Sequence, residues 1–137
     1  MNFYELKPES ISLTTIEEVL DIKLKLSSQA REKIISNRNY LESVIAKQNS
    51  TIYGINTGFG SLCNTVIPND KLAQLQHNLV ISHACGVGEE VPKEIVKTML
   101  FLKIQNMVFG FSGVSIELVE FLIELYNNDV LPIIYDT

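Results

Sequence analysis

Residues 92–109 read PKEIVKTMLFLKIQNMVF, and apolar side chains lie almost all the way round the helix that this spacing predicts. Pro92 suits the first turn of a helix, where no backbone N–H is needed, and Gly110 and Gly113 end it. A helix without a polar face has to be covered on several sides, inside a helical bundle or at a subunit interface. The stretch therefore predicts a mainly α-helical fold built around residues 92–109.

Two helices are predicted before this run. Thr15 and Glu18 have the spacing of a capping box, so the sequence IEEVL opens a short first helix. Ser27 or Ser28 caps a longer second helix, because the apolar positions of residues 29–48 recur at helical spacing. The N-terminal third of the chain is therefore predicted to consist of helices and connecting turns.

Two further helices are predicted later in the chain, followed by an apolar tail. One covers residues 70–84 and ends at Gly86. The other covers residues 115–126, and its glutamates share one solvated face: Glu117, Glu120 and Glu124. Residues 127–137, NNDVLPIIYDT, are extended and apolar with no evident partner strand. Such a tail indicates a fragment of something longer, and a complete protein with a loose tail is the alternative.

The composition places the chain among globular proteins. It has 137 residues, of which 46% are hydrophobic and 20% charged, which suits one domain with a real core. The formal charge of −5 argues against nucleic acid or an anionic membrane as a partner. No apolar stretch approaches the roughly 20 residues that span a bilayer. Cys63 and Cys85 fit neither a disulfide framework nor a CxxC pair, so we expect a soluble, cytoplasmic protein.

An unusual glycine-rich loop, around residues 50–67, separates the second and third helices. It opens with TIYGINTGFG, which contains no lysine or arginine and so lacks the cation of a phosphate-binding loop. In the run that starts at Gly58, Cys63 stands where a dinucleotide-binding fingerprint has its third glycine. The loop is therefore not expected to bind a nucleotide.

Tyr53 in this loop has two interpretations. In the first, the loop is a tight structural turn, and Tyr53 and Phe59 pack into the core. In the second, Tyr53 is a general base. Its pKa, near 10 for a free phenol, would then have to fall by roughly three units, partly through hydrogen bonds from backbone N–H groups of the loop. The residues alone leave both interpretations open.

His83, in VISHACGVG, also has a structural and a functional interpretation. A single histidine near an apolar helix is more often a satisfied structural group than a ligand-binding one. His77 lies six residues earlier, roughly 240° away around a helix, so the two rings cannot share a metal on one face. No metal site is therefore expected.

Taken together, IYGINTGFG, LQHNLVISHACGVG, GFSGVS and LYNNDVLPIIY resemble, in order and spacing, the N-terminal part of the histidine ammonia-lyases. These enzymes belong to the aromatic amino acid ammonia-lyase superfamily. The resemblance covers nearly the whole chain. It implies the helical N-terminal domain of a long helical bundle, with residues 50–67 as an active-site loop. It also implies a homotetramer whose active sites draw on three subunits, which would cover the helix at residues 92–109.

The resemblance assigns roles to four residues. Tyr53 matches the catalytic base that removes the β-proton of the substrate, and the backbone of Gly60 matches a substrate contact. Ser82 and His83 match the pair that reads the substrate ring. This pair is Ser-His in histidine lyases, His-Leu in tyrosine lyases and Phe-Leu in phenylalanine lyases. The implied substrate is L-histidine. A tyrosine or other aromatic amino acid ammonia-lyase or aminomutase remains the alternative, because some tyrosine aminomutases place a histidine nearby.

The resemblance also implies a cofactor that this chain does not supply. The family makes methylidene-imidazolone (MIO) from an internal Ala-Ser-Gly, which occurs nowhere in these residues. Family sequences place it just beyond a stretch like VLPIIY, so residues 1–137 are expected to be a single N-terminal domain that ends just before it. The parent enzyme would convert L-histidine to trans-urocanate and ammonia in histidine catabolism, without a metal, and the fragment would be inactive. A non-enzymatic helical interaction module is the alternative from another class.

Overall fold

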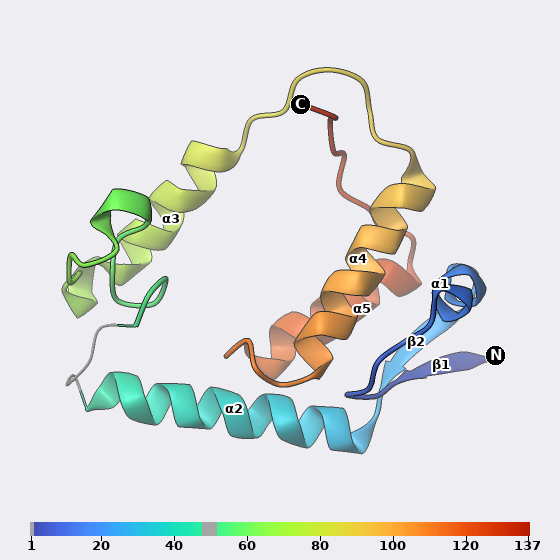
Figure 1. Cartoon of the computed structure of the whole chain (residues 1–137), viewed down its shortest axis with the longest axis horizontal. Coiled ribbons are helices and arrows are strands. Elements are labelled where there is room, and N and C mark those ends of the chain that lie inside the picture. Colours follow the sequence, from blue (N-terminus) through green and yellow to red (C-terminus); the bar gives the residue numbers. More distant parts are fainter. Residues whose placement is uncertain (1, 48–51) are drawn as a thin grey trace.

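The computed structural model describes residues 2–47 and 52–137, and in these ranges the protein is mainly helical, as predicted (Figure 1). The elements in chain order are β1 Phe3–Leu6, α1 Leu13–Val19, β2 Lys23–Leu26, α2 Ser28–Ala46, the 3₁₀ turns η1 Gly60–Leu62 and η2 Asn69–Lys71, α3 Leu72–His83, α4 Lys93–Val108 and α5 Ile116–Asn127. None of the helices described combines the length and the apolar character that crossing a bilayer requires.

The hydrophobic core lies where α4 packs on α5, with α2 and the small sheet beside them. Phe101 of α4 is fully buried, and its ring meets those of Tyr126 and Tyr4 at centroid distances of 6.4 and 6.1 Å. The other fully or almost fully buried members of this core are Leu6, Val19, Leu24, Ala30, Ile34, Ile104, Met107, Val108, Val119 and Ile123. The helix predicted at residues 92–109 is therefore the centre of the core.

The burial of α4 is nevertheless one-sided. Ile95, Met99 and Leu102 remain 51%, 48% and 41% exposed, although they lie on the same helix as the buried Phe101. The described residues of this chain therefore cover only one face of α4. Its outer face is an apolar surface that these residues leave open to solvent.

Two helix starts show how local hydrogen bonds set the boundaries. Ser27 caps α2, as predicted, because its hydroxyl accepts from the backbone N–H of Ala30 at 3.2 Å. The capping box predicted at Thr15 is wrong. Ser12 caps α1, and its hydroxyl accepts from the N–H of Thr15 at 3.1 Å, so α1 begins one turn earlier. A serine one turn upstream competes equally well for the free N–H groups at a helix start.

The fold contains a short parallel sheet that was not predicted from the sequence. β1 and β2 pair in parallel, and Leu6 and Leu24 turn one face of the pair into the core. The side chain of Asn127, at the end of α5, pairs with the backbone of Leu24: the N–H of Leu24 donates to Oδ1 at 2.7 Å, and Nδ2 donates to the carbonyl at 2.9 Å. The Asn127 amide therefore makes to β2 the two hydrogen bonds that the backbone of a neighbouring strand would make, and it fixes the sheet to α5.

Tyr126 supplies a pH-dependent contribution to this core. Its hydroxyl donates to the carbonyl of Val19 at 2.8 Å. Burial, and to a smaller extent the carboxylates of Asp21 and Asp129, raise the pKa of Tyr126 to about 12. The neutral phenol is thus favoured in the folded state.

We expect the free energy of unfolding to fall between about pH 10 and pH 12 through this residue. In that window the tyrosine of the unfolded chain loses its proton while that of the folded chain keeps it. Each unit of difference between the two pKa values changes the free energy of unfolding by about 1.4 kcal/mol. Below the ordinary pKa of tyrosine, about 10, the full stabilising contribution of Tyr126 is present. Urea unfolding measured across this pH range should therefore show the free energy of unfolding falling more steeply with pH for the unmodified chain than for its Tyr126→Phe variant. Equal pH slopes for the two proteins would contradict the assignment.

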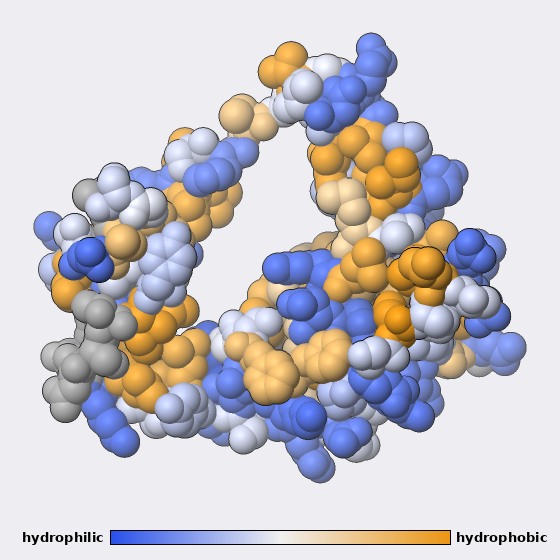
Figure 2. All heavy atoms as spheres, in the orientation of Figure 1, coloured by the Kyte–Doolittle hydropathy of each residue, from blue (hydrophilic) through white to orange (hydrophobic). Residues whose placement is uncertain are grey.

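α3 stands apart from this core. Figure 1 shows α3 and the loop before it on the far side of an opening from α4 and α5, and Figure 2 shows that side chains do not fill the opening. No residue of α3 is buried, and Val80 and Ile81 are 67% and 62% exposed. The described chain consists of a packed core and a helical arm that reaches out of it.

Candidate active site

The glycine-rich loop is braced by its own backbone. Thr57 and Val66 form an antiparallel bridge, and the N–H of Gly58 donates to the carbonyl of Thr65 at 3.1 Å. The N–H of Ile52 donates to Oδ1 of Asn56 at 2.7 Å, which closes the turn that carries Tyr53. The loop therefore holds its shape with little help from the core.

Tyr53 is 64% exposed and meets the ring of Phe59 edge-on at a centroid distance of 6.0 Å. The interpretation that packs Tyr53 into the core is therefore wrong for the residues described here. Gly60 has a φ of 56°, which favours glycine, and a side chain at this position would meet nothing within 4 Å. The loop thus presents a phenol and a stretch of bare backbone to its surroundings.

His83 is the last residue of α3, and its ring is oriented by the helix. Nδ1 lies 2.8 Å from the carbonyl oxygen of Leu79 and 3.0 Å from Oγ of Ser82. A carbonyl can only accept, so Nδ1 carries the proton and the neutral ring keeps its lone pair on Nε2. Ser82 itself donates to the carbonyl of Leu79 at 2.9 Å. The serine thus supports the imidazole, whose Nε2 is directed away from these bonds.

The tail has a partner strand, contrary to the sequence analysis. Residues 134–137 run antiparallel to residues 87–91, the segment between α3 and α4. Val87 and Thr137 exchange backbone hydrogen bonds of 2.9 and 3.1 Å. The N–H of Asp136 donates to the carbonyl of Glu89 at 3.1 Å, and that of Val91 to the carbonyl of Ile134 at 2.8 Å. We call this pairing the tail ladder.

Two glycines make the tail ladder possible. A Cβ on Gly86 would lie 2.8 Å from the ring of Tyr135, closer than such atoms approach one another. Gly88 has a φ of 106°, and a Cβ there would overlap the carboxylate of Asp136. Gly86 was predicted to end a helix, but α3 ends at His83 and Gly86 instead provides room for an aromatic ring.

A cavity of about 510 Å³ lies between His83 and the tail. Its lining is His83, Ala84, Cys85, Gly86, Ile133, Ile134, Tyr135 and Thr137. Of the four residues predicted for the site, only His83 lines it, and Tyr53, Gly60 and Ser82 do not. The structure thus adds the tail residues to the candidate site, and sequence reasoning missed them because the tail was expected to have no partner.

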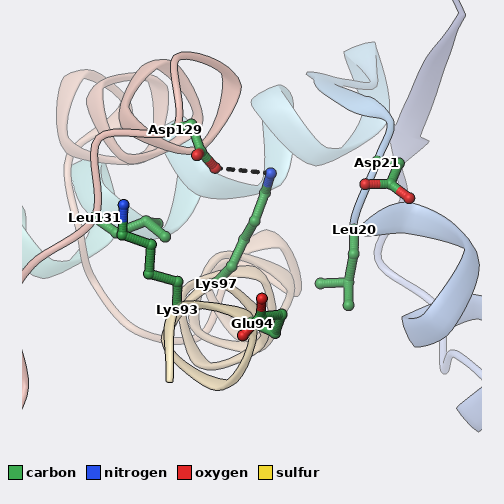
Figure 3. A pocket seen from close by; sticks show the side chains of 7 residues that line it. All are labelled: Leu20, Asp21, Lys93, Glu94, Lys97, Asp129 and Leu131. Atoms are coloured by element: carbon green, nitrogen blue, oxygen red, sulfur yellow. Dashed lines mark hydrogen bonds and ion pairs between the residues drawn. The ribbon is translucent and has the colours of Figure 1, made fainter. Parts of the chain in front are cut away.

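The start of the tail is fixed at a second, smaller cavity, of about 210 Å³, beside α4 (Figure 3). Nζ of Lys97 lies 3.0 Å from Oδ1 of Asp129 and 5.1 Å from the centre of the Tyr126 ring. The hydrogen bond and the charge of Lys97 hold the pKa of the Asp129 carboxyl below its usual range. Asp129 has a positive φ of 56°, which turns the chain out of α5 into the tail. The tail is therefore held at both ends.

Neither cavity has the ligands of a metal site. Within residues 2–47 and 52–137, no group of three or more histidine, cysteine, aspartate or glutamate side chains is placed to hold a metal ion. Cys63 and Cys85 are both free thiols. The chemistry that these residues offer consists of a phenol, an imidazole and open backbone.

The fold is that of the helical lyases. Residues 11–137 match the family model for aromatic amino acid lyases, and the chain belongs to that family. Among curated proteins, the histidine ammonia-lyase of Legionella pneumophila (strain Corby) is 45% identical over 131 residues, which are 94% of this chain and 26% of that enzyme. The histidine ammonia-lyase of Deinococcus radiodurans is 46% identical over 112 residues, 82% of this chain and 21% of that enzyme.

Solved structures agree with the fold. The crystal structure of histidine ammonia-lyase from Trypanosoma cruzi superposes with a TM-score of 0.85 at 29% identity, over 99% of this chain and 27% of that one. The ergothionase of Treponema denticola superposes with a TM-score of 0.90 at 27% identity, over 98% of this chain and 27% of that one. This chain spans about a quarter of the length of these relatives.

Proposed function

We propose that the chain is the N-terminal part of a histidine ammonia-lyase, which converts L-histidine to trans-urocanate and ammonia. The observation that carries this proposal is the oriented imidazole of His83 at the cavity, in a chain 45% identical to curated histidine ammonia-lyases. Nε2 of His83 accepts a hydrogen bond from an N–H of the substrate imidazole. A phenyl side chain has no N–H or O–H to offer, which favours histidine over phenylalanine.

The proposed MIO group would have to come from outside these 137 residues, because they contain no Ala-Ser-Gly. Thr137 lines the cavity, so a segment that continued from it would begin beside His83. The open cavity of about 510 Å³ has the size of small-molecule sites and fits this arrangement. When present, the group supplies an electrophile that makes the substrate amine a better leaving group.

The residues of this chain bind the substrate and move one proton. As a phenolate, Oη of Tyr53 takes the β-proton and becomes the neutral phenol, and the exposed backbone of Gly60 lies against the bound substrate. Tyr53 has an exposed ring on a loop held by its own hydrogen bonds, so the loop can meet further parts of an active site without disturbing the core. A homotetramer of the full-length enzyme would cover α3, which the described residues leave without a buried side chain.

The parent enzyme, meaning this chain together with the proposed rest of the lyase, tests the proposal. We expect it to form urocanate from L-histidine, followed by ultraviolet absorbance, and the 137-residue chain alone to form none. If the native C-terminal part is not in hand, the remaining three quarters of the Legionella pneumophila enzyme can be joined after Thr137. A parent enzyme inactive on L-histidine refutes the substrate assignment. Turnover by the 137-residue chain refutes the proposed origin of the electrophile.

His83→Leu should change the substrate preference more than the chemistry. The variant removes the polar partner of the substrate imidazole, and an unmet hydrogen bond of this kind costs about 1–3 kcal/mol. We expect kcat/KM of the parent enzyme for L-histidine to fall by roughly ten- to a hundredfold, with activity on phenylalanine or tyrosine raised relative to it. His77→Leu, an exposed histidine on the same helix, is the matched control. An unchanged preference among the three amino acids would restore the structural interpretation of His83.

A further inference from the structure

The ring of Tyr135 is placed by close packing at the candidate site. It lies directly on Gly86, where an added Cβ would come within 2.8 Å of Cδ2, 3.3 Å of Cβ and 3.4 Å of Cγ. Its backbone forms the bridge with Glu90 at the centre of the tail ladder. The side chain is still 41% exposed, so one part of it is packed and the rest is open.

Tyr135 and His83 line the same cavity, with Ile133 beside them on the tail. Ile133 is 68% exposed, so the tail offers an apolar and an aromatic surface at the edge of this space. The hydroxyl of Tyr135 makes no hydrogen bond within the described residues and can therefore turn to a ligand. These features suit a planar ring, which stacks on an aromatic face and packs against an aliphatic side chain.

We propose that Tyr135 is a specificity-determining residue that contacts the ring of the amino acid substrate, and that Gly86 is small in order to admit it. The proposal rests on the function proposed above, and it assigns a binding role to the tail. In this arrangement His83 provides the polar contact to the substrate ring, and Tyr135 provides the stacking contact. The ring position is set by the tail ladder, which fixes the backbone on either side of Tyr135.

The test uses four variants of the parent enzyme. Tyr135→Leu keeps an apolar side chain on Gly86 and removes the aromatic face, so it separates substrate stacking from support of the tail. Tyr135→Phe keeps the ring, and Tyr135→Ala removes both contributions. Tyr40→Leu, at a tyrosine of α2 that is 69% exposed and borders neither His83 nor the tail, is the matched control.

We expect Tyr135→Leu to raise KM for L-histidine by about three- to tenfold, the range that an aromatic contact is worth, with kcat changed by less than about twofold. The inhibition constant of imidazole, which probes the ring site without the chemistry, should rise by the same factor. Tyr135→Phe should restore both values, and Tyr40→Leu should leave them unchanged. If Tyr135→Ala fails to fold, Tyr135→Leu still decides the question.

Wild-type KM and wild-type imidazole inhibition in a folded Tyr135→Leu variant would overturn the proposal. Equal effects of Tyr135→Leu and Tyr135→Phe on KM would also overturn it, because the aromatic ring would then make no difference to substrate binding. A wild-type parent enzyme with no activity on L-histidine is a different result, because it refutes the proposed function itself. Imidazole binding to that inactive protein and to its Tyr135→Leu variant, measured by titration calorimetry in place of inhibition, would still report whether Tyr135 contacts a planar ring.

Discussion

Replacement of Tyr53 by phenylalanine in the parent enzyme is expected to lower kcat for L-histidine by about 10²–10⁴-fold, the usual contribution of a general base. Only the hydroxyl is removed. The edge-on contact with Phe59, at a centroid distance of 6.0 Å, involves the ring alone and should survive. The backbone hydrogen bonds of the loop do not use the Tyr53 side chain either, so the loop should keep its shape.

The measurement is the rate of urocanate formation at saturating L-histidine, together with a thermal unfolding curve. A loss of kcat with an unchanged melting temperature assigns the effect to proton transfer. Tyr40→Phe is the control, since Tyr40 is similarly exposed but lies on α2. If Tyr53→Phe keeps a near-normal kcat, Tyr53 is not the base.

The second large effect concerns stability. Phe101→Ala should lower the free energy of unfolding of the chain by about 3–5 kcal/mol, because it removes a fully buried ring from the centre of the core. The rings of Tyr4 and Tyr126 both contact Phe101, so the truncation leaves a cavity with two aromatic walls. The wall formed by Tyr126 cannot close it easily, since the hydroxyl of Tyr126 is bonded to the backbone of Val19.

Urea unfolding followed by circular dichroism gives the difference. Phe111→Ala makes the same chemical change at a ring that is 82% exposed, and it should cost less than about 0.5 kcal/mol. Equal losses for the two variants would mean that Phe101 is not the centre of the core. A loss near 5 kcal/mol for Phe101→Ala would indicate that α4 and α5 cannot move closer to each other to fill the cavity left by the ring.

The helices could be predicted from the sequence because their signals are local. Ser27 and the helical spacing after it define α2, and residues 115–126 define α5 to within one residue. The error at α1 was also local, since Ser12 and Thr15 are both good caps and only packing selects between them.

The strands were missed for a different reason. FYEL and KLKL are only four residues each, and the side chain that bonds the second strand to the core, Asn127, lies 103 residues from Leu24 in sequence.

The candidate site could be predicted only in part. Tyr53, Gly60, Ser82 and His83 were predicted through motifs, and their roles stay predictions. Tyr135 and the cavity beside His83 could not be found in this way, because they depend on a tail that returns to residues 87–91. Gly86 was interpreted from the sequence as the end of a helix, and only the structure shows that it lies against the ring of Tyr135.

The tail ladder joins Val87 to Thr137, and the whole of α4 and α5 lies between the two partners. Closing so long a loop costs chain entropy, which the four backbone bonds of the ladder described here repay only after the helices have brought the strands together. The ladder should therefore form late in folding and open early in unfolding. A formed tail ladder would then indicate that α4 and α5 have already packed in the core. A molecule in which α4 and α5 have not packed has no cavity beside His83, so binding at this position is limited to correctly folded chains.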